Sequence, residues 1–262
     1  MHEVQSGLGA RGFSNGALYD ASRPDYSRDA VAHVVSCLAL DASAHVLDLG
    51  AGTGIFSRQI APYVSRVTAV EPSASMRESL SRRSPSIDVR DGRDVAIPLP
   101  SRSVDAVVVA QAFHWFDAPR ALLEIHRVLT EGGGLALIWN DRDDTVEWVA
   151  QVTSVLARVR PPDLEGARDV ASVRESGLFT EMSHARFSHA QVLTRDALSR
   201  LIASRSYVSV LDEGSRARLL RDVARVVEAL PEPLRLPYVT DVYCARSRHG
   251  DTSRRDRDGS LA

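Results

Sequence analysis

The stretch that reads HVLDLGAGTG could bind a nucleotide-like cofactor. It begins as an apolar, alternating segment that reaches Asp48. Glycine then occupies every second position: Gly50, Gly52 and Gly54. Glycine permits positive φ and lets a ligand lie against bare backbone, and the first N–H groups of the helical pattern that follows can receive an anionic group. About twenty residues later, the strand-like residues 66–70 end in Glu71, where doubly wound folds hold ribose hydroxyls.

The spacing of the glycines separates two kinds of cofactor. A dinucleotide site requires G-x-G-x-x-G, whereas Ile55 stands where the third of these glycines would fall. The stretch instead resembles motif I of the class I S-adenosylmethionine (SAM) dependent methyltransferases, with Glu71-Pro72 as the acidic end of the second strand. We therefore favour SAM over a nicotinamide cofactor, and both over a plain βαβ crossover whose glycines only make the turn.

A second set of motifs resembles one branch of that family, the trans-aconitate methyltransferase-like enzymes. Residues 109–117, VAQAFHWFD, resemble its motif IV, and residues 125–129 and 139–143 resemble an I-H-R-V-L…W-N-x-R-D run. The N-terminal aromatic and R-P-x-Y pattern of the branch is matched by Phe13, Tyr19, Arg23, Pro24 and Tyr26. Late R-S-Y-V and L-P-Y-x-T-x-V-Y patterns complete the resemblance, which covers roughly residues 10–247.

The resemblance implies which residues would bind SAM. Glu71 would accept hydrogen bonds from both ribose hydroxyls, and Asp94 would meet the adenine amine. Pro72 and Met76 would wall the adenine, and Gln111 would lie beneath the cofactor. An Arg-Asp pair stands at the adenine position where relatives more often carry a small residue. The loop residues expected around the methionine part of SAM are Asp48, Gly50, Ala51, Gly52 and Gly54.

The chemistry of methyl transfer indicates which residues each kind of methyl acceptor would need. Methyl transfer is an in-line displacement at a sulfonium methyl group, so the enzyme supplies mainly alignment and exclusion of water. A carboxylate acceptor is already ionised at neutral pH and needs a cationic clamp, whereas a phenol or alcohol must lose a proton to a base. His114 follows the fourth strand, where open α/β sheets meet ligands. We predict that His114 is either a catalytic base or a wall of the pocket.

Further side chains are candidates for contact with the acceptor. Arg23 and Arg205 are candidate carboxylate clamps, although a solvated or ion-paired arginine is the simpler interpretation of each. The aromatic candidates, each of which could instead serve ordinary packing, are Tyr19, Tyr26, Trp115 and Trp139. We expect no metal site, because His184 and His189 have no acidic or thiol partners at ligand spacing.

The composition excludes several classes of protein. The chain has 262 residues, a formal net charge of −2 and no basic stripe, so we expect no nucleic-acid partner. It contains no lysine, which rules out a lysine nucleophile. No apolar stretch has the length of a membrane span or of a secretory signal. Cys37 and Cys244 lie far apart in sequence, and we expect them to be inert packing residues in a reducing cytoplasm.

Alternating strands and helices must position these residues. We predict strands at 45–49, 66–70, 86–90, 104–110, 134–139, 179–193 and 234–245. Helices are predicted at about 29–40, after the N-cap Asp117, at 145–159, after the N-cap Thr194, and at 215–230. The alternation predicts an α/β fold with a doubly wound, mostly parallel sheet. The resemblance implies the Rossmann-like class I methyltransferase fold, with seven strands that end in an antiparallel pair.

We predict a single SAM-dependent methyltransferase domain over residues 1–246. Residues 1–40 would form an N-terminal lid, 41–140 the SAM-binding core, and 141–246 a substrate-side insertion with the final strands. Residues 247–262 are charged and nearly devoid of apolar side chains, which predicts a disordered tail.

The expected function is SAM-dependent methyl transfer to a small-molecule acceptor, preferably at a carboxylate or hydroxyl oxygen. The acceptor would be a small polycarboxylate or an intermediate of secondary metabolism, and S-adenosylhomocysteine would be the second product. The enzyme would be a monomer or a homodimer with no membrane or nucleic-acid partner. The alternatives are transfer to nitrogen or carbon, a SAM-binding module without catalysis, and a nicotinamide oxidoreductase.

Overall fold

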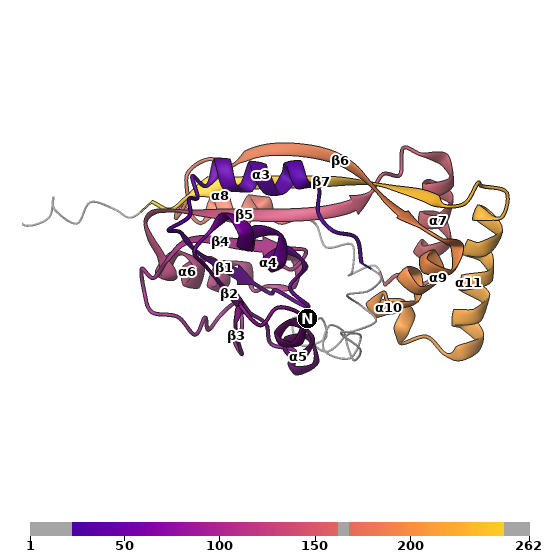
Figure 1. Ribbon diagram of the computed structural model, residues 1–262, viewed down its shortest axis with the longest axis horizontal. Coiled ribbons are helices and arrows are strands. Elements are labelled where there is room, and N and C mark those ends of the chain that lie inside the picture. Colours follow the sequence, from indigo (N-terminus) through magenta and orange to yellow (C-terminus); the bar gives the residue numbers. More distant parts are fainter. Residues whose placement is uncertain (1–22, 162–167, 249–262) are drawn as a thin grey trace, which may run out of the picture.

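The computed structural model describes residues 23–161 and 168–248 (Figure 1). Its elements, in chain order, are α3 (Arg28–Cys37), β1 (His45–Leu49), α4 (Ile55–Ile60), the 3-10 helix η1 (Ala61–Tyr63), β2 (Arg66–Val70), α5 (Ala74–Arg83), β3 (Asp88–Arg90), β4 (Val104–Ala110), the 3-10 helix η2 (Phe113–Trp115), α6 (Ala118–Val128), β5 (Leu129–Arg142), α7 (Glu147–Ala157), α8 (Val170–Glu175), β6 (Ser183–Leu193), α9 (Arg195–Ala203), α10 (Ser206–Ser209), α11 (Glu213–Val227) and β7 (Leu234–Arg246). No helix within the described ranges is both long and apolar enough to cross a membrane. Much of the predicted lid, including Tyr19, lies outside the described residues.

Seven strands form one sheet in the order β3-β2-β1-β4-β5-β7-β6. The first five strands run parallel, and β7 runs antiparallel to both of its neighbours, β5 and β6. This arrangement confirms the predicted doubly wound α/β fold and its antiparallel final pair. The strand order reverses between β1 and β4, and folds of this kind bind ligands in a crevice at the carboxyl ends of the two strands beside such a reversal.

Helices cover both faces of the sheet, which explains why its central strands are almost wholly apolar. Along β1, Leu47 and Leu49 belong to the core shared with α6 and α8. Val46 points to the opposite face and belongs to the core shared with α3, α4 and α5. Because β1 and β4 are buried on both sides, the loops that leave their carboxyl ends start from a firmly packed base.

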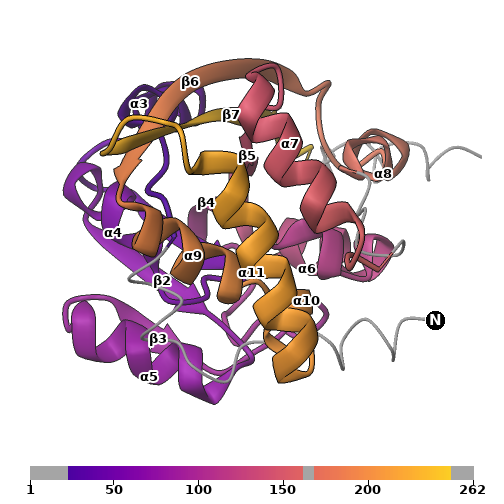
Figure 2. The ribbon, with the colours of Figure 1, turned by 90° about the vertical axis from the view of Figure 1, so that its right-hand side faces the viewer.

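The helices α7, α9, α10 and α11 form a helical lobe with a core of its own. Figures 1 and 2 show them gathered beyond the carboxyl end of β5, where β6 ends and β7 begins. Buried members of the core of this lobe include Val149, Val152, Leu198, Leu201, Leu219, Val223, Leu234 and Leu236. The lobe is drawn from the part of the chain that was predicted to form the substrate side.

Strand β5 is longer at both ends than its predicted range. It begins at Leu129 instead of Gly134 and continues to Arg142 instead of Trp139. The glycine-rich segment does not form a separate turn, because it stays within the strand while the register with β4 shifts after the pair Val104–Leu129. The last residues of β5 stay paired with β7 as far as Arg142, whose side chain donates a hydrogen bond to Thr153 in α7 of the helical lobe.

The predicted disordered tail and the predicted cap of α6 also need correction. Ser247 and Arg248 are attached to the core, since their N–H groups donate to the carbonyls of Gly133 and Leu178, each at 2.8 Å. The rest of the tail lies outside the described residues. Asp117 does occupy the N-cap position, but its side chain makes no capping hydrogen bond.

Cys37 and Cys244 form a disulfide, so the prediction that they are separate, inert packing residues is wrong. Cys37 is the last residue of α3, and Cys244 lies on β7. The two residues are 207 positions apart in sequence, yet their Cα atoms are 6.6 Å apart. Sequence spacing does not reveal this pair, because only the tertiary fold places the first described helix on the last strand.

Candidate active site

Two loops form the walls of the crevice between β1 and β4. The glycine-rich loop follows β1, and residues 111–117 follow β4. The loops approach closely at Gly50, where an added Cβ would lie 2.6 Å from the Cβ of Ala112. Gly50 also has a φ of +73°, which L side chains rarely adopt. Glycine is therefore required at this position by both the backbone conformation and the neighbouring loop.

Gly52 differs from Gly50 because it faces open space. Its φ is +57°, and no atom lies within 4 Å of the position that a Cβ would take. The Gly52 N–H donates to Oε2 of Glu71 at 2.9 Å, which attaches the loop to the end of β2. The loop, which also includes Ala51, then enters α4 through Gly54 as the N-cap. This geometry leaves room for a ligand against bare backbone.

Glu71 directly follows β2, and the backbone holds both of its carboxylate oxygens. Oε2 accepts from Gly52, and Oε1 accepts from the N–H of Ser73 at 2.8 Å. Burial raises the pKa of Glu71, and the two hydrogen bonds act in the opposite direction. A carboxylate oxygen can accept about two hydrogen bonds, so each oxygen keeps one site for a further donor. The two adjacent hydroxyls of a ribose match this arrangement.

Asp48 lies behind the loop at the end of β1 and is 1% exposed. The Ser57 hydroxyl donates to its Oδ2 at 2.5 Å, whereas its Oδ1 has no hydrogen-bond partner. Burial raises the pKa of Asp48 to about 7, and the carboxylate of Glu71 adds to this rise. A nearby cation would favour the charged form of Asp48. The charge of this part of the crevice therefore fits a cofactor that carries an amino group and a sulfonium.

The residues predicted to contact the adenine lie around the end of β2 and the second loop. Pro72 is exposed directly after Glu71, and Met76 is buried in α5. Oδ2 of Asp94 accepts from the N–H of Asp117 at 2.9 Å, which ties the segment after β3 to the end of the second loop. Burial raises the pKa of Asp94. The contact of these three residues with adenine stays a prediction.

Gln111 directly follows β4 and has the left-handed conformation, with a φ of +58°. This conformation is uncommon for a residue with a side chain, and such residues cluster at functional sites. The Gln111 side chain donates from Nε2 to the carbonyl oxygen of Asn140 at 2.7 Å, and its N–H donates to the carbonyl of Ile138 at 2.9 Å. The second loop is thereby fixed to the end of β5.

His114 lies in η2, at the centre of the second loop. Burial lowers its pKa to about 4, with Asp141 acting in the opposite direction and Arg160 in the same direction. The imidazole is therefore neutral at neutral pH. Its ring centroid lies 5.0 Å from that of Trp115. A group with this pKa is a poor general base near pH 7, because general bases act best when their pKa lies near the working pH.

Three arginines meet beside two tyrosines where the helical lobe faces the sheet. This arginine cluster consists of Arg23, Arg142 and Arg205, next to Tyr207 and Tyr238. Burial lowers the pKa of Arg142 to about 10, and the charge of Arg205 contributes in the same direction. Burial raises the pKa of Tyr238, on which all three arginine charges act in the opposite direction. Arg205 is thus close enough to affect Arg142, and all three guanidinium groups are close enough to affect the same phenol.

The nitrogens of Arg142 are only partly used by the chain. Nη2 donates to the hydroxyl of Thr153 at 3.1 Å, but Nε and Nη1 are buried without a hydrogen-bond partner. Nε of Arg205 is also buried without one. Unpaired buried cationic groups are costly, so proteins usually pair them with an anion. The cluster therefore has the character of an anion-binding site.

Hydrogen bonds connect the arginine cluster to the crevice. The side chain of Asn140, whose carbonyl accepts from Gln111, donates from Nδ2 to the carbonyl of Asp25 at 3.2 Å. Arg23, two residues before Asp25, donates from Nη2 to the carbonyl of Ser204 at 3.5 Å. The end of β5, the segment before α3 and the helical lobe thus meet at one place.

Sequence reasoning missed Arg142. It named Arg23 and Arg205 as candidate clamps; the structure places Arg205 near Arg142, and all three arginines near Tyr238. The available signal was the W-N-D-R-D run, which puts an arginine just beyond the strand predicted to end at Trp139. Because β5 continues to Arg142, that side chain reaches the lobe instead of a solvent-exposed loop.

Two aromatic candidates have packing contacts in the structure. The ring of Tyr26 packs edge-on against Phe56 at a centroid distance of 5.3 Å. Trp139 packs edge-on against Tyr243 at 5.8 Å, and the guanidinium of Arg168 lies 5.8 Å from its ring centroid. A contact of Tyr26 or Trp139 with the acceptor stays a prediction, as does that of Trp115.

The histidines that were dismissed as metal ligands have partners that the sequence does not show. Nε2 of His184 lies 2.6 Å from Oδ1 of Asp241, an acidic partner that the spacing along the sequence does not show. The pairing of β6 with β7 brings them together, although they are far apart in sequence. His189 bonds through Nε2 to the carbonyl of Asp25 at 3.0 Å.

Known proteins resemble this chain over most of its length. Residues 47–137 match the family of the methyltransferase domain. An uncharacterized methyltransferase-like protein of Schizosaccharomyces pombe is 34% identical over 221 residues, which cover 82% of this chain and 85% of that protein. An uncharacterized methyltransferase of Mycobacterium bovis is 36% identical over 234 residues, which cover 87% of this chain and 91% of that protein.

A solved methyltransferase structure also resembles this chain. It comes from Anaeromyxobacter dehalogenans, is provisionally described as a type II methyltransferase, and is 26% identical with a TM-score of 0.63. The match covers 86% of this chain and 97% of that one. The residues that match the domain include the glycine-rich loop and Glu71, whose geometry suits a ribose-containing cation. The chain therefore belongs to the class I SAM-dependent methyltransferases, and SAM is its cofactor.

Proposed function

We propose that this methyltransferase acts on a carboxylate oxygen of a small organic acid with at least two carboxylates. The observation that carries the proposal is the buried Arg142, whose Nε and Nη1 have no partner, beside Arg205. A carboxylate can accept two parallel hydrogen bonds from one guanidinium group. One carboxylate in the arginine cluster would orient the acid, and a second would present the oxygen that receives the methyl group.

The pKa of His114 supports an acceptor that needs no base. A phenol ionises near pH 10, and an alcohol higher still, so either must lose a proton during the reaction. His114, with its pKa lowered to about 4 by burial, accepts such a proton poorly. A carboxylate has already lost its proton at neutral pH. We therefore assign His114 to the wall of the pocket and not to proton transfer.

The residues of the chain would act mainly by alignment. When bound, SAM supplies a methyl group activated by a positively charged sulfur. Glu71 would hold the ribose, and Arg142 with Arg205 would hold the acid at the other side of the crevice. Gln111 and His114 would line the path between them. Because no proton has to move, exclusion of water and a fixed approach would account for most of the rate.

Transfer from methyl-labelled SAM to a panel of di- and tricarboxylic acids, with phenols and amines as comparison, tests this proposal. The products are then treated with alkali, and volatile methanol is counted. We expect label to be released as methanol from acid substrates, because alkali hydrolyses methyl esters. Label in an alkali-stable product would contradict the proposal and point to an ether, amine or carbon acceptor. SAM binding with no turnover on any acceptor would favour a binding module.

Two wider statements belong to the same proposal. Methyl ester formation on a small polycarboxylate would place the chain in the trans-aconitate methyltransferase-like branch. A role in secondary metabolism would follow if the preferred acid comes from such a pathway. Comparing the esters in extracts from cells with and without the gene would test both, and identical ester profiles would contradict them.

A further inference from the structure

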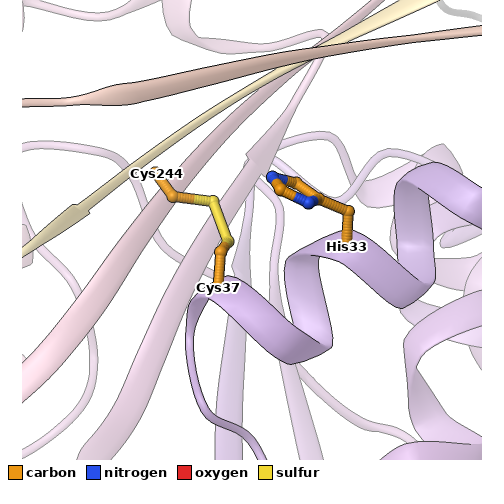
Figure 3. A group of neighbouring side chains, drawn as sticks. All are labelled: His33, Cys37 and Cys244. Atoms are coloured by element: carbon orange, nitrogen blue, oxygen red, sulfur yellow. A yellow bond between two sulfur atoms is a disulfide. The ribbon is translucent and has the colours of Figure 1, made fainter.

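Three side chains that can ligate a metal meet between α3 and β7, on the side of the helix that faces the sheet (Figure 3). His33 and Cys37 are four residues apart on this helix, which puts them on one face, and Cys244 lies opposite on β7. One ligand atom from each residue lies within 4.8 Å of the other two. Figure 3 shows the imidazole turned toward the two sulfur atoms. This is the one such group of three histidine, cysteine or acidic side chains found among the described residues.

His33 has an unused nitrogen in this group. Its Nε2 is buried and has no hydrogen-bond partner in the structure. The ring lies 5.3 Å from the ring of Phe187, centroid to centroid, and so has an apolar neighbour. Leaving a buried polar atom without a partner costs free energy. A missing ligand that accepts the lone pair of this nitrogen would explain the arrangement.

We propose that the reduced protein binds one Zn²⁺ through His33, Cys37 and Cys244. A histidine and two cysteines, with water as fourth ligand, is a set that zinc accepts in tetrahedral geometry. Bond lengths of about 2.0–2.3 Å hold such ligand atoms roughly 3.5 Å apart, so the sulfurs would separate and the imidazole would move slightly inward. The site lies between α3 and β7, away from the crevice, and does not depend on the proposed acceptor.

The oxidation state of the two cysteines would decide whether the metal binds. Reduction by a dithiol transfers two electrons and two protons to the disulfide, giving two thiols, while the donor becomes a disulfide. Binding of Zn²⁺ then displaces the two thiol protons, because zinc binds thiolates. Both the disulfide and the zinc-bound thiolates would link α3 to β7 across 207 residues of sequence. The chain would keep this link under reducing conditions, where a disulfide does not persist.

Cobalt(II), which takes the same tetrahedral site as zinc, provides a direct test. The full-length protein is reduced with a phosphine, freed of metal with a chelator, and titrated with Co²⁺ while the thiolate-to-cobalt absorption band is recorded. We expect the band to saturate at one equivalent and to disappear when Zn²⁺ is added. The oxidised protein should give no band. Native mass spectrometry of the reduced and oxidised forms with Zn²⁺ gives the same answer without any variant.

Variants identify the ligands. Cys37→Ser and Cys244→Ser should abolish the band, and His33→Asn should weaken Zn²⁺ binding at least about tenfold, since each removes a ligand. The matched control is His126→Asn, a histidine on α6 that should leave the titration unchanged. SAM affinity checks that every variant is folded. The proposal is overturned if folded, reduced wild-type protein takes up no zinc, or if His33→Asn binds zinc as tightly as the control.

Discussion

The cofactor side of the crevice and the proposed acceptor side differ in how they would recognise their ligands. On the cofactor side, the glycine-rich loop and Glu71 present backbone and carboxylates, and they lie within one βαβ unit of the sheet. On the acceptor side, Arg23, Arg142 and Arg205 present guanidinium groups, and they come from the segment before α3, the end of β5 and the helical lobe. The cofactor side is therefore local and negative, and the acceptor side is dispersed and positive.

This difference in charge suits the two ligands. SAM is a cation at its sulfur and amino group, and Asp48 and Glu71 lie on its side of the crevice. An acid with several carboxylates would carry the opposite charge to the other side. Each ligand would compensate a charge that the folded protein holds at a cost. If the acceptor is such an acid, electrostatics alone would order a cationic donor and an anionic acceptor, without any proton transfer.

The largest effect is expected from Arg142→Gln. The variant loses two charge-assisted hydrogen bonds to the acid, so KM for acid substrates should rise about a hundredfold. SAM affinity should stay unchanged, because the cofactor side is not touched. The free energy of unfolding should rise, since a buried charge with unpaired nitrogens is removed. Steady-state kinetics, calorimetry with SAM and thermal unfolding measure the three quantities.

The matched control for Arg142→Gln is Arg158→Gln. Arg158 lies at the end of α7 in the same helical lobe but pairs with Asp222 at 3.4 Å on the surface. It should change neither KM nor SAM affinity. Equal effects of the two substitutions on KM would argue that general charge, and not the arginine cluster, attracts the acid.

Glu71→Gln should give the next largest effect, which is a loss of SAM affinity on the cofactor side. Its neutral amide accepts weaker hydrogen bonds from ribose hydroxyls, so SAM affinity should fall about tenfold or more. KM for the acid, measured at saturating SAM, should stay unchanged. Equilibrium titration with SAM checks this, with Glu78→Gln on the exposed face of α5 as control. Unchanged SAM affinity would remove Glu71 from the cofactor site.

Alanine substitutions at Gly50 and Gly52 should affect the free energy of unfolding and SAM affinity differently. At Gly50 the new Cβ meets Ala112 at 2.6 Å, so Gly50→Ala should cost about 2 kcal/mol of unfolding free energy. At Gly52 the Cβ enters open space, and the positive φ should cost about 1 kcal/mol. Gly52→Ala should nevertheless lose SAM affinity, because the methyl group occupies the space left for the cofactor. Chemical denaturation and SAM titration distinguish the two outcomes, and the reverse ranking would contradict the assignment.

The smallest effect on ligand affinity is expected at His114, because its imidazole is uncharged at neutral pH. The unfolded chain protonates this residue near its ordinary pKa of 6.5, and the folded protein only near pH 4. Between these values the unfolded state binds more protons, so stability falls as the pH is lowered from about 6.5 to 4. At pH 5 the loss should be about 2 kcal/mol, and His114→Gln should remove it. Denaturation curves at pH 7 and pH 5 provide the measurement; the same loss in both proteins would contradict the burial of a neutral imidazole.

The sequence predicted the cofactor side better than the acceptor side, for a physical reason. A turn that needs positive φ leaves glycines at alternate positions, and the carboxylate after β2 follows about twenty residues later along the chain. The arginine cluster has no such local constraint. Arg142 belongs to the cluster because β5 extends beyond Trp139. The helical lobe then places Arg205 near Arg142. The link between Cys37 and Cys244 was hidden for the same reason, since it depends on α3 lying against β7.

The most direct test of the charge difference is equilibrium binding of a tricarboxylic acid in the presence of S-adenosylhomocysteine, which prevents turnover. Isothermal titration would compare the wild type, Arg142→Gln and Arg158→Gln. The account predicts that the acid binds the wild type and Arg158→Gln equally, and Arg142→Gln about a hundredfold more weakly. Equal affinity of all three proteins would contradict it.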